Sequence, residues 1–278
     1  DAIEAGETPE DAERTLMDIG AKVLPTLMKD TTDRNRTSPF AFTGNKFEFR
    51  MPGSAVSVAD PAIILNTAVA DSLREIRKSL ESTPKEDLTT AIMAHLQKLL
   101  KEHKKILFNG NGYAEDWVDQ AVARGLYNLK SVPDAMPAFL DPKNTKLLED
   151  YHIYSASEIH ARYEINLENY AKAIHIESLT LQDMIKKDVT PSILSYSTAI
   201  CDEALSKKEL SPDIDTSYET ELVAELSKYY ASIRAGLKKL SCDTKAAEDE
   251  SDSLKKAVLY HDTILSDMAA IRTAVDAA

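Results

Sequence analysis

The sequence is poor in cysteine, and its two cysteines form no recognisable motif. Cys201 and Cys242 lie far apart without a CxxC pair, and the six histidines fall in no zinc-like spacing. No secretory apolar segment is found either, so a reducing compartment is favoured, and we expect both residues to be half-buried thiols. No apolar run approaches the roughly 20 residues that a membrane span needs. We therefore expect a soluble, cytoplasmic protein that does not enter a membrane.

Positive charge is also in deficit. The 33 Lys and Arg residues are outnumbered by 46 Asp and Glu residues, which gives a formal net charge of −13. Because phosphate backbones are bound by basic surfaces, no nucleic acid is expected as a partner. The chain has 278 residues, of which 43% are hydrophobic, and this is ample for a core. It opens at Asp1 rather than at a methionine, and we expect it to be the C-terminal part of a longer protein.

Glycine and proline are scarce in the second half of the chain. After Ser155 the only prolines are Pro191 and Pro212. The stretches that they help to separate have helical periodicity and cover residues 155–208, 213–240 and 244–275. In the second and third stretches, side chains of the predicted core recur every three or four residues, namely Leu222, Leu226, Tyr229, Ile233, Leu237 and Leu240, then Leu254, Val258, His261, Leu265, Met268 and Val275. We predict a mainly α fold in which residues 131–278 form an antiparallel bundle of long helices, kinked rather than ended at Pro191.

The first 130 residues are more mixed in character. Capping residues and apolar spacing predict helices from Thr8 to about Leu24, from Asp60 onward, at 85–108 and at 114–125. A loop and strand are expected at 31–52, and a proline-punctuated connector at 133–142. The Asn-Gly-Asn-Gly run at 109–112 lacks the GxGxxG and Walker spacings of a phosphate-binding loop. We interpret it as a turn that ends a helix.

Charged and aromatic residues alternate strictly between Lys46 and Arg50. As a strand, this segment places Lys46, Glu48 and Arg50 on one face, and Phe47 and Phe49 on the other. A carboxylate between two cations stays ionised and suits a divalent metal, while the cations suit phosphate oxygens. Spacing alone is equally compatible with a surface strand that carries a ladder of charges.

The stretch from Asp33 to Arg50 resembles the active-site strand of type III glutamine synthetase. The resemblance is carried by the pair Asn35-Arg36, the step Ser38-Pro39 and the basic-x-Glu-x-Arg strand, which occur in this order and at this spacing. Further similarity runs through Asn109–Tyr113 and Ile159–Glu164 and then fades. The resemblance implies that residues 1–130 are a small α+β remnant of the catalytic domain, and that 131–278 are a helical C-terminal domain.

The resemblance also implies roles for individual residues. Members of the family join ammonia to L-glutamate through a γ-glutamyl phosphate, using ATP and Mg²⁺ or Mn²⁺. Glu48 would be a metal ligand, and Arg50 would face the phosphoryl group or the glutamate. Arg36 would contact ATP phosphates or the glutamate carboxylate. Lys46 stands where relatives have an arginine near the nucleotide, so a point charge replaces a planar fork.

The resemblance implies a homo-oligomer of stacked rings, a dodecamer, for the intact enzyme. The remaining metal carboxylates, the metal histidine and the loop that closes over glutamate would come from the upstream chain, so this chain alone is expected to be inactive. Two other interpretations stay open: a helical interaction or scaffold module whose charged strand is incidental, and a nucleotide-binding module of another ligase family.

Other polar residues are given structural roles. Arg34 is equally suited to a phosphate contact or to an ion pair with Asp33, and it is left out of the site. Three histidines of the helical segments are expected to be satisfied or exposed rather than metal-bound, namely His152, His160 and His175. Three charged residues are expected to form ion pairs on a helix face, namely Glu158, Arg162 and Glu164.

Overall fold

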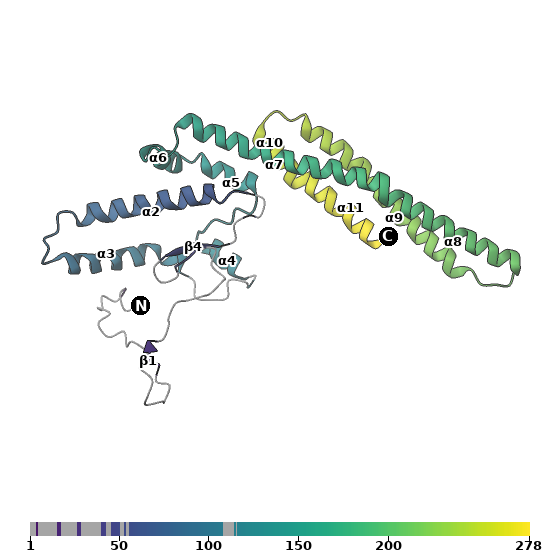
Figure 1. Ribbon diagram of the computed structural model, residues 1–278, viewed down its shortest axis with the longest axis horizontal. Coiled ribbons are helices and arrows are strands. Elements are labelled where there is room, and N and C mark those ends of the chain that lie inside the picture. The colour runs from purple at the N-terminus through teal and green to yellow at the C-terminus, as the bar shows by residue number, and fades with distance from the viewer. Residues whose placement is uncertain are drawn as a thin grey trace. The chain divides into compact units, whose positions relative to one another are not determined.

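The computed structural model in Figure 1 shows a mainly α protein, which confirms the predicted fold class. It describes residues 4, 16–17, 27–28, 40–42, 46–50, 53, 56–107, 114 and 116–278. The chain divides into two compact units, Asp1–Asn128 and Leu129–Ala278. The assignment of 1–130 to a catalytic domain and of 131–278 to a separate helical domain stays a prediction.

In the described part of the first unit, four short strands form two antiparallel pairs. Strand β1 (Leu16–Met17) pairs with β2 (Leu27–Met28), and β3 (Phe40–Phe42) pairs with β4 (Phe47–Phe49). The predicted helix from Thr8 to Leu24 is therefore wrong at Leu16–Met17, where pairing with β2 overrides the local helical signals. The rest of that predicted helix lies outside the described residues.

Among the described residues of the first unit, helices α2, α3 and α4 follow the strands. Helix α2 (Ala59–Leu80) and helix α3 (Leu88–His103) lie where apolar spacing predicts them, and a 3₁₀ turn, η2 (Lys104–Ile106), extends α3. Helix α4 (Asp116–Ala123) ends just before Gly125, whose φ of 73° lies in the left-handed region that favours glycine. The turn predicted at 109–112 lies outside the described residues.

Two short helices replace the connector predicted at 133–142. Helix α5 (Val132–Phe139) and helix α6 (Pro142–Asp150) each have a proline in the first turn, where a missing N–H costs nothing. The Ser131 side chain accepts from the backbone N–H of Asp134, and the Asp141 side chain accepts from that of Lys143. The connector prediction was wrong because it read these prolines as breaks rather than as helix starts.

Long helices make up the rest of the second unit. Helix α7 (Ala156–Met184) passes through a π turn, η3 (Ile185–Val189), into helix α8 (Thr190–Leu210), and helix α9 (Ser217–Glu248) packs against α8. Helix α10 (Ser253–Leu259), a second π turn, η4 (Tyr260–Ile264), and helix α11 (Leu265–Ala277) complete the bundle. Figure 1 shows α8 and α9 continuing past the C-terminal end of α11.

The helix that begins at Ala156 has a capping box. The Ser155 hydroxyl accepts from the backbone N–H of Glu158, and the Glu158 carboxylate accepts from the backbone N–H of Ser155 at 2.8 Å. These bonds hold the pKa of the Glu158 carboxyl below its usual value. The chain therefore starts α7 where the sequence predicted a long helix.

Pro191 neither ends the helical rod nor leaves it regular. The residue lies in the first turn of α8, directly after the π turn Ile185–Val189. Because proline cannot donate to the carbonyl four residues earlier and its ring crowds that carbonyl, a locally widened turn accommodates it. This outcome agrees with the predicted kink or break within one domain.

The boundary between the second and third predicted helical stretches is different in the structure. Helix α9 continues through residues 241–243 to Glu248, because Thr244 and Ala247 are buried on the same face as Leu240. The chain turns instead at 249–252, where Asp252 caps α10 by accepting from the backbone N–H of Lys255 at 2.8 Å.

The core of the bundle follows the predicted stripe in α9 but not in the last helices. Leu226, Ile233 and Leu240 are buried as expected. In the last stretch Val258 is exposed, and the buried side chains are those of Ala257, Tyr260, Ile264 and Ile271. Ala257, Tyr260 and Ile264 each lie one position before a predicted core residue, so the buried face is displaced by one residue already at Ala257, before the π turn Tyr260–Ile264 begins.

Both cysteines are free and exposed, so the expectation of half-buried thiols was wrong. Cys201 and Cys242 lie on the outward faces of α8 and α9, and nothing in helical periodicity alone sets how far a flanking position is covered. None of the helices in the described ranges combines the length and the apolar character that a membrane span requires.

Candidate functional site

The alternation of side chains predicted for residues 46–50 is found in strand β4. Its partner β3 supplies the register Phe40↔Phe49, Ala41↔Glu48 and Phe42↔Phe47. Consecutive side chains of a strand point to opposite faces, so Glu48 lies on the face opposite the two phenylalanines. Those aromatic side chains are 57% (Phe47) and 38% (Phe49) exposed, because a two-stranded sheet offers little to cover them.

Glu48 is the centre of the charged face. The Arg50 guanidinium donates to Glu48 Oε2 from Nη2 at 3.3 Å and from Nε at 3.4 Å. Lys46 Nζ lies 3.9 Å from the other oxygen, Oε1. The side chain of Glu48 is 41% exposed and that of Arg50 is 18% exposed. The strand therefore holds one carboxylate between two cations, as its spacing predicts.

This cluster has the chemistry of a phosphate and metal-ion site. The carboxylate supplies hard oxygen atoms, which Mg²⁺ and Mn²⁺ prefer, and the guanidinium and ammonium groups supply donors for phosphate oxygens. A single carboxylate cannot complete the coordination of such an ion. Among the described residues, no group of three or more His, Cys, Asp or Glu side chains is placed to hold a metal ion.

Arg36, predicted to contact ATP phosphates or the glutamate carboxylate, lies outside the described residues, as does Arg34. The structure therefore brings together Lys46, Glu48 and Arg50, and the role of Arg36 stays a prediction.

The histidines of the helical segments have structural surroundings. His175 Nδ1 lies 2.9 Å from the hydroxyl of Tyr260, and the two rings meet edge to face. Burial raises the pKa of the Tyr260 hydroxyl. His160 stacks on Tyr163, and exposed His152 has a φ of 54° just after α6.

The three charged residues near the start of α7 differ in part from the predicted ion pairs. Glu164 lies 4.0 Å from His160. Glu158 belongs to the capping box, and the Arg162 guanidinium lies over the ring of Tyr154 at 4.2 Å from its centroid. The capping box could have been recognised from the spacing of Ser155 and Glu158, whereas the contact of Arg162 with Tyr154 depends on how the chain enters the helix.

One cavity was missed by sequence reasoning. It lies between α2 and α3, and polar side chains from both helices line it, namely Asp71, Ser72, Glu75, His95 and His103. The only signal in the sequence is that polar residues interrupt the apolar faces of two consecutive helices. This signal could be interpreted only once the structure showed which faces of α2 and α3 are turned toward each other.

Comparison with known proteins gives a consistent result. Residues 91–208 match the family model described as the glutamine synthetase C-terminal domain. A glutamine synthetase of Butyrivibrio fibrisolvens is 40% identical over 278 residues, which is 100% of this chain and 39% of that protein. One of Bacteroides fragilis is 32% identical over 275 residues, covering 97% of this chain and 37% of the relative. A type-3 glutamine synthetase of Dictyostelium discoideum is 37% identical over 265 residues, covering 92% and 36%. The chain thus spans less than two-fifths of the length of these relatives.

Proposed function

Because this chain belongs to the glutamine synthetase family and resembles the type-3 enzyme, we propose that it serves in the ATP-dependent ligation of ammonia to L-glutamate. The reaction would pass through a γ-glutamyl phosphate. The observation that carries the proposal is the β4 cluster, in which Glu48 is held between Lys46 and Arg50 on one strand face.

In this proposal the cationic side chains act on the phosphates. Arg50 is more enclosed than Lys46 and can present two N–H groups to a phosphoryl or carboxylate oxygen. It would stabilise the negative charge that develops as the phosphoryl group moves to glutamate. Lys46, which is more exposed, would attract the nucleotide as a point charge. Arg36 would contribute a further contact to ATP or to the glutamate carboxylate.

Glu48 would hold a divalent cation on the side of the nucleotide. Its half-exposed carboxylate fits this role, since part of the side chain remains open to solvent and can meet an ion. The ion, Mg²⁺ or Mn²⁺, would screen the phosphate charge when bound. Glu48 would be one ligand, and the others would be supplied by a part of the protein beyond this chain.

The 278-residue chain alone is proposed to be inactive. Catalysis requires several metal ligands and a closed, dry site held in fixed geometry, and the β4 cluster offers a single carboxylate on an open two-stranded sheet. The complete enzyme is proposed to be a homo-oligomer of stacked rings in the cytoplasm.

The test is Glu48→Ala in the full-length protein. We expect metal-dependent ATP turnover to fall at least a hundredfold, on the order of the loss seen when one charge-stabilising group is removed, while the thermal midpoint stays close to that of the wild type. The matched control is Glu86→Ala, which removes an exposed carboxylate before α3. Wild-type turnover by Glu48→Ala would contradict the assignment and favour a non-catalytic scaffold role.

A further inference from the structure

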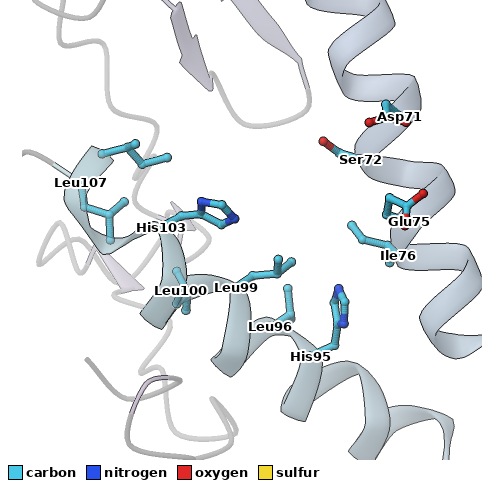
Figure 2. Close-up of a pocket in the computed structure, with 11 residues that line it drawn as sticks. Asp71, Ser72, Glu75, Ile76, His95, Leu96, Leu99, Leu100, His103 and Leu107 are labelled. Atoms are coloured by element: carbon cyan, nitrogen blue, oxygen red, sulfur yellow. The ribbon is translucent and has the colours of Figure 1, made fainter. Parts of the chain in front are cut away.

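A cavity of about 480 Å³ lies between α2 and α3 within the first unit (Figure 2). Leucine and isoleucine side chains form most of its surface, among them Ile76, Leu96 and Leu99. Its size is within the range of small-molecule sites, which are mainly apolar with a few placed polar groups. None of its lining residues belongs to the β4 cluster.

The hydrogen bonds of Ser79 indicate the tautomer of a neutral His95 ring. The Ser79 hydroxyl donates to the carbonyl of Ile76 at 2.8 Å, and a hydroxyl has one proton to donate. In its 3.2 Å contact with His95 Nδ1, Ser79 must therefore be the acceptor and the imidazole the donor. The neutral ring then has its proton on Nδ1, which leaves Nε2 as an acceptor.

That acceptor is unsatisfied within the described part of the chain. Nε2 of His95 is buried and makes no hydrogen bond among the described residues. Buried polar atoms are nearly always paired, so an orphaned one in a residue that lines a cavity indicates a missing donor. We infer that a molecule bound in the cavity supplies this donor.

The α2 side of the cavity also offers acceptors. The Ser72 hydroxyl donates to the carbonyl of Ala68 at 3.0 Å, so its lone pairs remain for another donor. Figure 2 shows its oxygen directed into the space between the helices. Asp71 and Glu75 add negative charge at the same wall.

The carboxylates already have cationic neighbours on α2 itself. Arg74 donates to Asp71 at 2.6 Å, and Lys78 donates to Glu75 at 3.0 Å. Lys78 holds the pKa of the Glu75 carboxyl below its usual value. An ionised carboxylate has about four acceptor positions, so the contacts of Glu75 with Lys78 and Arg74 do not exhaust its oxygens.

We propose that this cavity binds a small amphiphilic cation, in which an aliphatic or aromatic body bears a primary ammonium group. The apolar walls take the body. The ammonium has three donors and no acceptor, which matches a rim that offers His95 Nε2, the Ser72 hydroxyl oxygen and carboxylate oxygens. A carboxylate ligand meets no donor at His95 or Ser72 and is repelled by Asp71 and Glu75. The net charge of −13 favours the same sign of ligand.

The first experiment is a calorimetric titration of the 278-residue chain with 4-phenylbutylammonium. Two probes with the same phenylbutyl body serve as controls, 4-phenylbutanol and 5-phenylpentanoate. We expect saturable 1:1 binding of the ammonium, binding of the alcohol at least tenfold weaker, and no measurable binding of the carboxylate. Equal affinity for all three probes, or no binding of the ammonium, would overturn the proposal.

Variants locate the site. His95→Phe keeps a planar ring and removes the acceptor, and Ser72→Ala removes the second acceptor with little change of shape; each is expected to weaken ammonium binding about tenfold. Leu99→Trp fills the cavity and should abolish binding. The control is His160→Phe, at an exposed histidine of α7, which should bind as the wild type does.

Far-UV circular dichroism establishes that each variant is folded. Should His95→Phe fail to fold, Ser72→Ala and Leu99→Trp still decide the question. Wild-type affinity in folded Leu99→Trp, or in both acceptor variants, would place the ligand elsewhere and end the proposal. The titration requires no ligase activity, so its outcome is independent of the proposed function.

Discussion

At the scale of single residues, Lys46, Glu48 and Arg50 share one face of β4 because side chains alternate along a strand with a period of two. So short a period made this arrangement predictable from spacing alone. Contacts between distant residues could not be predicted. His175 and Tyr260 meet across 85 positions of the chain, and the acceptor at His95 Nε2 is revealed only by the bonds of Ser79.

The identity of the cation at position 50 should matter more than its charge. In the full-length enzyme, Arg50→Lys keeps the positive charge but loses the planar fork that can bind two oxygens at once. We expect kcat/KM for ATP-dependent ligation to fall about tenfold to a hundredfold, measured by phosphate release. Arg77→Lys, at an exposed ion pair of α2, is the matched control. If the two variants have comparable kinetics, Arg50 has a structural role.

A second residue-scale prediction concerns the pair Lys207 and Glu219, which joins α8 to α9. The Lys207 ammonium holds the pKa of the Glu219 carboxyl below its usual value. A carboxyl whose pKa is lower in the folded state stabilises the fold above its unfolded pKa, and this contribution is lost as the pH falls through the folded pKa.

Glu219→Gln should therefore lower the thermal midpoint at pH values of about 7, and the difference from the wild type should shrink as the pH is lowered below about 4. Far-UV circular dichroism, which reports helix content, follows the thermal transition. Glu221→Gln removes an exposed carboxylate of the same helix and should show no such pH-dependent difference. If the difference in thermal midpoint between Glu219→Gln and the wild type does not change with pH, the ion pair between Lys207 and Glu219 is not its cause.

At the scale of secondary-structure elements, long amphipathic helices were predictable and their interruptions were not. Apolar spacing placed α2, α3 and α7, because a helix of several turns repeats its pattern often enough to be read. The short helices α5 and α6 were missed, since their prolines are also typical of loops. The first π turn lies beside Pro191, where a kink or break was predicted, whereas the second left no distinct sequence signal.

The packing of α9 on α11 gives an element-scale prediction at Gly236. A Cβ added there would lie 2.7 Å from Cγ1 of Ile271, whose side chain is 2% exposed and cannot move aside freely. Alanine gains about 1 kcal/mol over glycine in a helix, but overpacking a core costs about 1–3 kcal/mol. We expect Gly236→Ala to lower the free energy of unfolding in urea by about 1 kcal/mol.

A double-mutant cycle isolates this contact. In the background of Ile271→Ala the clash is gone, so adding Gly236→Ala should be neutral or stabilising by up to about 1 kcal/mol. If Gly236→Ala has the same effect in both backgrounds, the close approach of Gly236 and Ile271 does not determine the cost.

At the scale of the whole molecule, the sequence predicted the class of fold and the change of character along the chain. The second unit buries a continuous set of apolar side chains from α7, α9 and α11, with the interhelix bond between Ser178 and Thr244 at 2.8 Å inside it. Among the described residues, strand β4 pairs with β3 alone, and its phenylalanines are exposed. The sequence around β4 does not show which further strands complete that sheet, because the partner of a strand can come from any distance along a chain.

This contrast predicts a wide range of local stability within one polypeptide. A two-stranded sheet is marginally stable in water, whereas amides in the middle of a packed helix exchange only through large-scale opening. In hydrogen exchange on the 278-residue chain, amides around Ile233 in α9 should be strongly protected and those of Phe47–Phe49 weakly protected. Self-association could mask the difference by covering the strand edge, so the molecular mass in solution must be measured on the same sample. Equal protection at the two sites in a proven monomer would show that β4 has the support it needs within this chain.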